Sequence, residues 1–341
     1  MNPNSNKPII GISIGDCNGI GPEVILKALS DPRMVKMFTP VIYGHGRIIA
    51  FYRKALSMED FNFHQTRDID SIHHKKVNVL NISEECPDVF PGTESELAGK
   101  FALDSFEAAI EDLKSGKIHG LVTAPVNKNN INTEQTPFVG HTEHLTKAVG
   151  KNKSLMMMVS EDFRVGVITG HIPLHQVTQT ITKELIKEKC KLMLSSLEKD
   201  FGINKPKIAV LGLNPHAGED GLLGKEEIEI IQPAINELKD QNLYVFGPYP
   251  ADGFFGMMQQ KRFDGVLAMY HDQGLIPFKA LAFDSGVNFT AGLPVVRTSP
   301  DHGTAYAISG QNLAEAGSMR SALFLAVDVV NTHQQLEEAV S

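Results

Sequence analysis

Three histidines stand at positions suited to binding a metal ion. His171, His216 and His271 each come one to five residues after a short apolar run of the kind that forms a buried strand. Ligands of open α/β sheets bind outside the carboxyl ends of the strands, so these side chains could meet there. Three imidazoles with an open fourth position form a common catalytic site for a divalent metal such as zinc. The alternative is three unrelated loop histidines among the 13 of the chain.

Two carboxylates accompany these histidines. Asp272 directly follows His271, and Asp252 ends a segment rich in proline and glycine. Either could add a metal ligand, or orient an imidazole through its second nitrogen. The histidines are separated by 45 residues (216 − 171) and 55 residues (271 − 216), which leaves room between them for one or two βα units.

Polar residues elsewhere indicate a site for a small anion. His141 and Thr142 open a predicted helix, where free N–H groups favour an anion, although a simple helix cap explains them equally well. Lys279, Asn288 and Arg297 lie in an otherwise apolar stretch, where each either faces a pocket or extends to the surface. The turn Asp301-His302-Gly303-Thr304-Ala305 could hold a nucleotide or only reverse the chain.

Other motifs favour structural roles. The loop 15–21 has glycines at positions 15, 19 and 21, which match neither a Rossmann dinucleotide site nor a P-loop. A tight turn between a strand and a helix is the simpler interpretation. The segment 124–128 follows a strand and could approach an active cleft, but a plain loop is the default expectation. Met156-Met157-Met158 is expected to pack in the core.

Short apolar runs alternate with longer helical patterns along the chain. The expected strands cover 8–14, 40–43, 77–80, 120–123, 164–169, 207–213 and 265–270, and the expected helices cover 22–29, 98–114, 183–198, 225–239 and 315–330. This alternation predicts βα units and an α/β fold with a largely parallel or mixed sheet.

Length and composition limit the classes of function. The 341 residues suffice for one large core or two lobes. The net charge of −8 argues against nucleic-acid partners, because a phosphate backbone requires a basic surface. Three irregularly spaced cysteines argue against a disulfide framework and a thiolate zinc site. With no signal-like start and no apolar run of about 20 residues, we expect a cytoplasmic protein without a membrane partner.

Taken in order, the motifs resemble one family. They are Gly15-Asp16 with Gly19-Ile20-Gly21-Pro22-Glu23, Ala124-Pro125 with Asn127-Lys128, Gly140-His141-Thr142-Glu143, Thr169-Gly170-His171-Ile172-Pro173-Leu174, Gly212-Leu213-Asn214-Pro215-His216-Ala217-Gly218-Glu219, Gly247-Pro248-Tyr249-Pro250-Ala251-Asp252, Ala268-Met269-Tyr270-His271-Asp272-Gln273-Gly274, Gly292-Leu293-Pro294 with Arg297-Thr298-Ser299, and Asp301-His302-Gly303-Thr304-Ala305. Their order and spacing are similar to the 4-hydroxythreonine-4-phosphate dehydrogenase family of vitamin B6 (pyridoxal 5′-phosphate) biosynthesis over essentially the whole chain.

The resemblance implies a fold and an assembly. The fold is a two-lobed, three-layer αβα arrangement with mixed sheets, like that of isocitrate and isopropylmalate dehydrogenases. One lobe combines residues 1–128 with 280–341, and the central lobe, 129–279, carries the metal histidines and the dimer contacts. The resemblance implies a homodimer with the active site at the subunit interface, so that ligands come from both chains.

The resemblance also implies roles for particular residues. His171, His216 and His271 bind one divalent metal, with zinc as the first choice and magnesium or cobalt as alternatives. The substrate is bound by His141, Thr142, Lys279, Asn288 and Arg297. The general base stays open between Lys279, Asp272 and a water on the metal. NAD, or NADP, binds without a Rossmann motif, which agrees with the glycine spacing of the loop 15–21.

The implied reaction is the NAD-dependent oxidation of 4-phosphohydroxy-L-threonine. Its product, 2-amino-3-oxo-4-phosphohydroxybutanoate, is a β-keto acid that loses carbon dioxide to give 3-amino-2-oxopropyl phosphate. Two departures from the family pattern, Cys17-Asn18 in place of Pro-Ala and His175 in place of Arg, leave dehydrogenases of D-threonate or D-erythronate 4-phosphate as alternatives. Without the resemblance, a three-histidine metal hydrolase or a non-enzymatic binder of phosphorylated metabolites fits the same residues.

Overall fold

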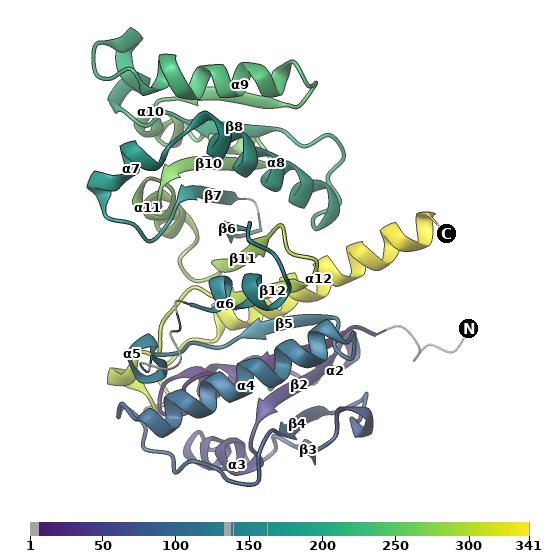
Figure 1. Cartoon of the computed structure of the whole chain (residues 1–341). Coiled ribbons are helices and arrows are strands. Elements are labelled where there is room, and N and C mark those ends of the chain that lie inside the picture. The colour runs from purple at the N-terminus through teal and green to yellow at the C-terminus, as the bar shows by residue number, and fades with distance from the viewer. Residues whose placement is uncertain (1–6, 133–137, 139, 162, 341) are drawn as a thin grey trace. The chain divides into compact units, whose positions relative to one another are not determined.

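The structure, a computed structural model, describes residues 7–132, 138, 140–161 and 163–340. Its contacts divide the chain into two compact units. The first unit comprises Met1–Asn152 and Leu293–Asn331, and the second comprises Lys153–Gly292 and Thr332–Ser341. Figure 1 labels the helices and strands of each unit.

Six parallel strands form the sheet of the first unit, in the order β3-β4-β2-β1-β5-β12. The strands are β1 (Ile9–Ser13), β2 (Thr39–Gly44), β3 (Phe63–Thr66), β4 (Val77–Asn81), β5 (Gly120–Thr123) and β12 (Val296–Pro300). The helices are α1 (Gly21–Leu29), α2 (Met34–Met37), α3 (Gly46–Ala55), α4 (Glu96–Lys114), α5 (Lys128–Ile131), α6 (His141–Ala148) and the start of α12 (Gly317–Val340), with short 3-10 turns η1 (Ile69–Ser71) and η5 (Tyr306–Ile308).

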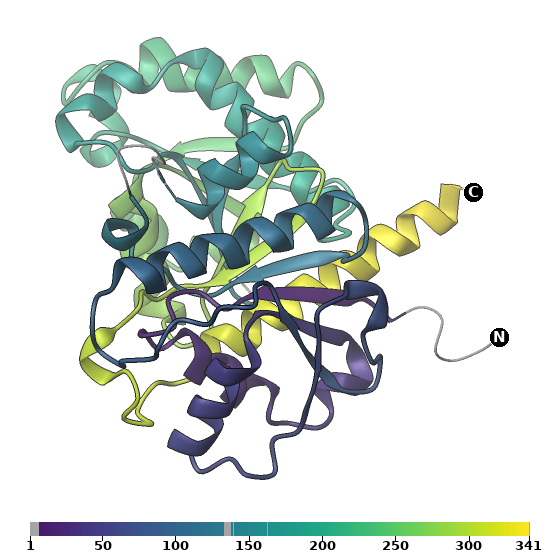
Figure 2. The same cartoon turned by 60° about the horizontal axis from the view of Figure 1, so that its bottom comes forward.

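Helices cover both faces of this sheet. Helix α4 lies against one face and α12 against the other, as the two views in Figures 1 and 2 agree. The buried positions of α4 recur every three or four residues, which is the pattern of a helix with one face on a core. Strands β2 and β5 are buried along their whole length, as expected for a parallel sheet covered on both sides.

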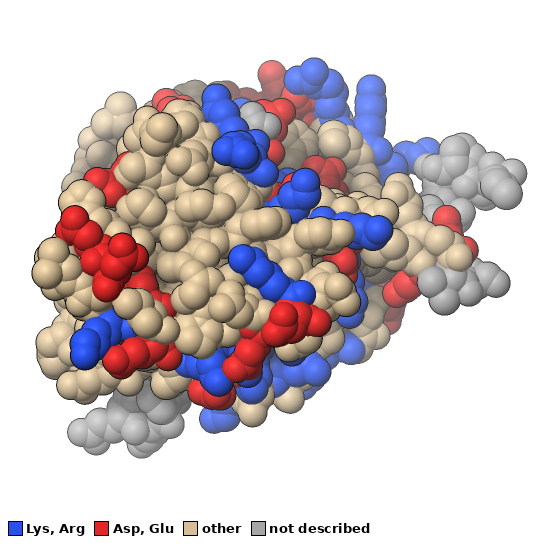
Figure 3. All heavy atoms as spheres, turned by 90° about the horizontal axis from the view of Figure 1, so that it is seen from above, with Lys and Arg blue, Asp and Glu red and all other residues tan. Residues whose placement is uncertain are grey.

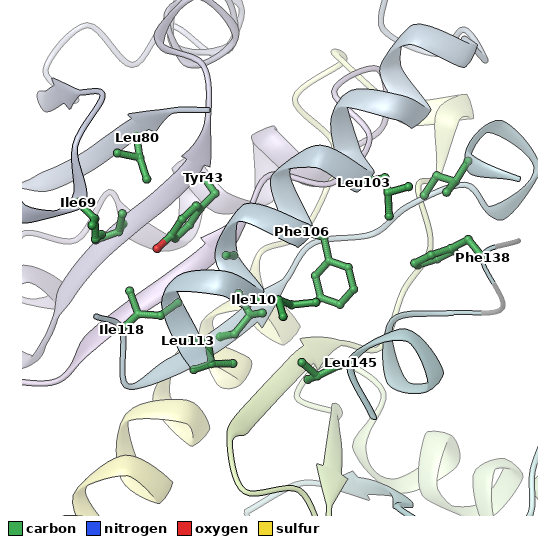
Figure 4. Packing of buried hydrophobic residues seen from close by; sticks show 14 residues of the cluster. Tyr43, Ile69, Leu80, Leu103, Phe106, Ile110, Leu113, Ile118, Phe138 and Leu145 are labelled. Carbon is green, nitrogen blue, oxygen red and sulfur yellow. The ribbon is translucent and has the colours of Figure 1, made fainter. Parts of the chain in front are cut away.

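Aromatic and aliphatic side chains fill the space between α4 and the sheet. Figure 4 shows Phe106, Ile110 and Leu113 of α4 in the same buried cluster as Tyr43 of β2. Phe138 joins this cluster beside Phe106, with ring centroids 6.5 Å apart. The core therefore extends from the sheet to Phe138.

The sheet of the second unit is mixed, in the order β11-β6-β7-β10-β8-β9. Strand β6 is antiparallel to both of its neighbours, and the remaining pairs are parallel. The strands are β6 (Leu155–Val159), β7 (Arg164–Thr169), β8 (Ile208–Leu211), β9 (Val245–Tyr249), β10 (Gly265–Tyr270) and β11 (Val287–Ala291). The helical elements are α7 (Leu174–Thr180), α8 (Lys183–Lys199), η2 (Pro215–Gly221), η3 (Glu227–Ile231), α9 (Gln232–Lys239), α10 (Ala251–Gly256), η4 (Gln259–Arg262) and α11 (His271–Ala282).

Two glycines allow α8 to pack closely on this sheet. A Cβ atom at Gly166 of β7 would lie 2.8 Å from the Met193 side chain, and one at Gly265 of β10 would lie 3.0 Å from the same residue. On the other side, Val165 and Ala268 join a buried cluster with Phe254. The strands that lead to the candidate metal histidines are therefore anchored on both faces.

The predicted α/β fold with a mixed sheet is confirmed, with local differences. Strands β11 and β12 fall in a stretch for which the sequence suggested no strand. The expected helix 225–239 begins as the single π-helical turn η3 before it continues as α9.

No helix among the described residues is long and apolar enough to cross a membrane. Figure 3 shows a face on which acidic and basic side chains border a broad uncharged area.

Candidate functional site

The three histidines follow neighbouring parallel strands of the second unit. The strands β7, β10 and β8 are adjacent in that order, so their carboxyl ends lie at one edge of the sheet. His171 comes two residues after β7, His271 is the first residue of α11 directly after β10, and His216 is the second residue of η2 after β8. The local topology therefore positions all three imidazoles at the edge where α/β enzymes bind their ligands.

His171 and His271 lie side by side. Their ring centroids are 5.7 Å apart and their planes are inclined by 46°. The Nδ1 atom of His271 is 2.7 Å from a carboxylate oxygen of Asp272, so that the imidazole is oriented through this nitrogen and Nε2 stays available. With metal–nitrogen distances of about 2.0–2.1 Å, two rings at this separation can bind the same ion after small rotations.

His216 stands apart from this pair in its surroundings. Like His171 it is exposed, but it belongs to a turn whose backbone has positive φ angles. Among the residues that the structure describes, no group of three or more His, Cys, Asp or Glu side chains is placed to hold a metal ion. The described part of the chain thus supplies a pair of adjacent imidazoles, His171 and His271, and a third imidazole at His216. His171, His216 and Asp252 are exposed, and His271 is half-buried.

A buried guanidinium defines the second cluster, in the first unit. Arg297 of β12 is 3% exposed, and its Nε and Nη2 atoms donate to the Thr123 hydroxyl of β5 at 3.1 and 2.5 Å. Its Nη1 atom is 3.4 Å from the Thr142 hydroxyl of α6. Burial lowers the pKa of Arg297 to about 10, while Glu143 favours the charged form, so the group is still a cation at neutral pH. A cation held among hydroxyls suits recognition of an anionic ligand.

His141 lies next to this cation with a nitrogen that has no partner. Its ring packs edge-to-face on Phe106 and Phe138, with centroid distances of 4.6 and 5.6 Å. The Nε2 atom is buried and makes no hydrogen bond to any residue that the structure describes. Burial, and then the charge of Arg297, hold the pKa of His141 well below its usual value, so the imidazole is neutral at pH 7. A neutral ring nitrogen can donate or accept one hydrogen bond from a ligand.

His141 lines a cavity of about 150 Å³. The other polar side chains of the wall are Thr123, Lys128, Ser299 and His302. The Nε2 atom of His302 is buried without a hydrogen-bond partner as well. An unsatisfied buried polar atom costs about 1–3 kcal/mol, so two in the wall of one cavity indicate that a polar ligand completes them. A second hollow, of about 230 Å³, lies in the second unit at the amino ends of β8 and β9, away from the edge with the histidines. No histidine is among its described lining residues.

Lys279 and Asn288 belong to the second unit. Lys279 lies in the last turn of α11 and is half-buried. Asn288 of β11 is opposite Met158 in the sheet, and its Oδ1 atom is buried without a partner. An unsatisfied amide oxygen of this kind can accept a hydrogen bond from a ligand hydroxyl or ammonium group.

Comparison with known proteins identifies the family. The sequence model described as pyridoxal phosphate biosynthetic protein PdxA matches residues 36–326. The chain belongs to the PdxA family. A 4-hydroxythreonine-4-phosphate dehydrogenase of Bacteroides thetaiotaomicron is 50% identical over 335 residues, which cover 98% of this chain and 92% of the relative.

Members of the PdxA family are named for more than one substrate. A protein of Cutibacterium acnes, provisionally named D-threonate 4-phosphate dehydrogenase, is 40% identical over 328 residues, or 94% of this chain and 93% of the relative. Among solved structures, a 4-hydroxythreonine-4-phosphate dehydrogenase from Klebsiella pneumoniae aligns with a TM-score of 0.82 at 33% identity and covers 96% of this chain and 99% of that one. The recognition of the family from its motifs is confirmed.

Two polar residues of the cavity wall, Lys128 and His302, were not predicted from the sequence as ligand-binding residues. Lys128 was expected in a loop after a strand, and His302 in a turn that could hold a nucleotide or only reverse the chain. Lys128 comes shortly after β5 and His302 shortly after β12, and these strands are parallel neighbours. The rule used for the metal histidines, polar residues after the carboxyl ends of adjacent strands, would have found both if the order of the strands had been known.

The lowered pKa of His141 predicts how stability depends on pH. Its pKa in the folded protein lies below the unfolded value of about 6.5, so the unfolded state binds the extra proton first. The free energy of unfolding that the neutral His141 imidazole contributes is fully present above about pH 6.5 and is lost as the pH falls toward the pKa of the folded protein. We expect acidification from about pH 7.5 to about pH 5.5 to lower the unfolding temperature more for the wild type than for His141→Gln. An equal decrease for both proteins, with His73→Gln as an exposed control, would exclude His141 as the cause.

Proposed function

We propose that this PdxA-family chain is an NAD-dependent 4-hydroxythreonine-4-phosphate dehydrogenase. It oxidises C3 of 4-phosphohydroxy-L-threonine, and the resulting 2-amino-3-oxo acid loses carbon dioxide to give 3-amino-2-oxopropyl phosphate, a precursor of pyridoxal 5′-phosphate. The observation that carries this proposal is the 50% identity to a relative of that name over 98% of the chain. The buried cation and the unsatisfied imidazoles of the first unit supply the chemistry that a phosphorylated substrate requires.

In this proposal, the anionic groups of the substrate bind to Arg297, Thr142 and His141. Arg297 is already held by Thr123 and Thr142, so its guanidinium is oriented before a ligand arrives. His141 is neutral and completes its Nε2 atom with one hydrogen bond to the ligand. Asn288, whose Oδ1 atom can accept a hydrogen bond, and Lys279 are the proposed substrate contacts in the second unit. Groups that are held in place before binding lower the entropy cost of orienting the reacting carbon.

We assign the divalent metal to His171, His216 and His271. The adjacent rings of His171 and His271, and the Asp272 carboxylate on Nδ1 of His271, are features of such a ligand set. A bound divalent ion supplies Lewis acidity, which lowers the pKa of a substrate hydroxyl. Because Asp272 is engaged with His271, we assign it to orienting this imidazole. We propose Lys279 as the group that receives the hydroxyl proton, a role for which its side chain has to be a neutral amine before the step.

We infer that two copies of the chain share the site. The described part of one chain does not bring three ligands together, and both His171 and His216 are exposed, so that a second copy can reach them. The second unit also exposes large apolar side chains, among them Leu222 at 76% and Phe283 at 72%. Exposed apolar side chains mark a protein–protein interface where they form a contiguous patch, and these two are candidates for such a patch. A homodimer would cover these side chains and bring His216 of one copy to the paired histidines of the other.

The substrate is the first point to test. The purified, metal-loaded protein is assayed by the absorbance of reduced nicotinamide with 4-phosphohydroxy-L-threonine, D-threonate 4-phosphate and D-erythronate 4-phosphate. We expect the amino-acid substrate to give a kcat/KM at least about 100-fold higher, equivalent to about 2.7 kcal/mol. The 40% identical relative named for D-threonate 4-phosphate makes the threonate ester the second candidate. A preference for that ester would reassign the substrate and keep the dehydrogenase.

A further inference from the structure

The loop after β8 contains a turn with left-handed backbone geometry. The five residues from His216 to Asp220 have φ angles of 52°, 51°, 82°, 44° and 52°. All except Gly218 are L-residues with side chains, and each such residue costs about 1–2 kcal/mol in this conformation. Consecutive residues of this kind persist only where the surrounding structure holds them. The first of them is His216, an assigned metal ligand.

A buried carboxylate supplies this support. Glu227, on the π-helical turn η3, is 3% exposed. Its Oε1 atom accepts hydrogen bonds from the backbone N–H groups of Leu213 and Asn214 at 2.7 and 2.8 Å. Its Oε2 atom accepts one from the Asn214 side-chain amide at 2.8 Å. The carboxylate therefore fixes the two residues that lead into Pro215 and His216.

Glycines allow the carboxylate to lie directly against the turn. A Cβ atom at Gly218 would be 2.7 Å from Oε2 of Glu227, and one at Gly212 would be 3.1 Å from Oε1. The same Cβ at Gly212 would lie 3.0 Å from Cα of Ala217. The entry to the turn, its centre and the carboxylate are thus in contact, and a side chain at either glycine would force them apart.

The same loop is joined to the start of α11. The side-chain amide of Gln273 donates to the Gly212 carbonyl at 2.6 Å, and its oxygen accepts from the Met269 N–H at 2.7 Å. Gln273 lies two residues after His271. The backbone that carries His216 is therefore held by Glu227 on one side and is tied to the backbone that carries His271 on the other.

We propose that Glu227 is a positioning residue of the dehydrogenase. It holds the turn 216–220 in the left-handed conformation in which His216 can bind the metal. This inference rests on the proposed function, because it takes His216 to be a ligand. Glu227 is buried behind the turn and acts through the backbone of Leu213 and Asn214. Its loss therefore changes the orientation of His216, and through it the affinity for metal, without removing a group that touches the substrate.

The test uses the full-length protein and cobalt(II) as the probe. Cobalt affinity is measured by competition with a chelator, and the geometry of the site by the visible absorption of bound cobalt. Glu227→Gln keeps one acceptor oxygen for the two backbone N–H groups, but removes the charge and turns an NH2 group toward the Asn214 amide. We expect it to weaken cobalt binding by about 10–100-fold, the range for partners behind a metal ligand. The cobalt spectrum should change as well. Glu229→Gln, the same change at an exposed position of η3, should leave both properties as in the wild type.

Two further variants keep the outcomes distinct. If Glu227→Gln does not fold, Glu227→Asp retains the charge but is too short to reach the loop, and the same loss of cobalt affinity is expected in a folded protein. His216→Ala is measured in parallel. Wild-type cobalt binding by His216→Ala would refute the ligand assignment itself. Weakened binding by His216→Ala, together with a wild-type affinity and spectrum in both Glu227 variants, would overturn only the role of Glu227.

Discussion

Replacement of His171, His216 or His271 by alanine is expected to remove the bound metal and to lower turnover by more than about 100-fold. Loss of an outer partner of a ligand costs about 10–100-fold, and loss of the ligand itself costs more. His171 and His216 are exposed, so their replacement removes little packing and the fold should persist. Metal content is measured by elemental analysis and turnover by the nicotinamide absorbance, with unfolding temperature as the control.

The exposed His175 of α7 is the matched control, since His175→Ala removes an imidazole close to the site without removing an assigned ligand. Retention of full metal content and activity by any one of the three ligand variants would contradict the assignment of that histidine. If the site is shared between subunits, a refolded mixture of His216→Ala with His171→Ala should regain part of the activity. The mixed dimer then contains one site with all its ligands.

The second large effect is expected at Arg297. Its buried guanidinium offers charge-assisted hydrogen bonds, each worth about 1.5–3 kcal/mol. Arg297→Ala should therefore weaken binding of the phosphorylated substrate by about 10–150-fold. NAD binding should change far less. Titration calorimetry with 4-phosphohydroxy-L-threonine and with NAD measures both affinities in the same protein.

Because Arg297 is buried, a loss of stability must be separated from a loss of recognition. Arg297→Lys keeps the charge but not the planar group that contacts Thr123 and Thr142, so it should fall between the wild type and alanine. An unchanged substrate affinity in Arg297→Ala, with a lowered unfolding temperature, would move Arg297 to a structural role.

The parallel core of the fold could be predicted because its signals are local. The strands β7 and β10 form within the expected ranges 164–169 and 265–270, where short runs of buried residues are bounded by turns. The helices α4 and α8 end within one residue of their expected positions, since their apolar pattern repeats over many turns. Strands β11 and β12 were missed because polar residues such as Asn288 and Arg297 interrupt their short apolar runs, so no local signal marks them.

The candidate site was only partly accessible from the sequence for a similar reason. The order β7-β10-β8 places the three histidines at one edge, and placement after strands indicated this edge in advance. The left-handed turn at His216 left no clear local signal, because Ala217 and Glu219 disfavour positive φ and the conformation depends on Glu227. Lys128 and His302 line the same cavity because β5 and β12 are neighbours in the sheet, and the sequence alone does not show that these two strands pair.

One measurement tests the proposed reaction most directly. The purified, metal-loaded protein is incubated with NAD and 4-phosphohydroxy-L-threonine, and reduced nicotinamide, carbon dioxide and the remaining substrate are quantified together. The proposal predicts that one reduced nicotinamide and one carbon dioxide form for each substrate consumed, and that chelation of the metal stops all three changes. Consumption of the substrate with release of inorganic phosphate and without reduction of NAD would contradict it and would indicate a metal hydrolase.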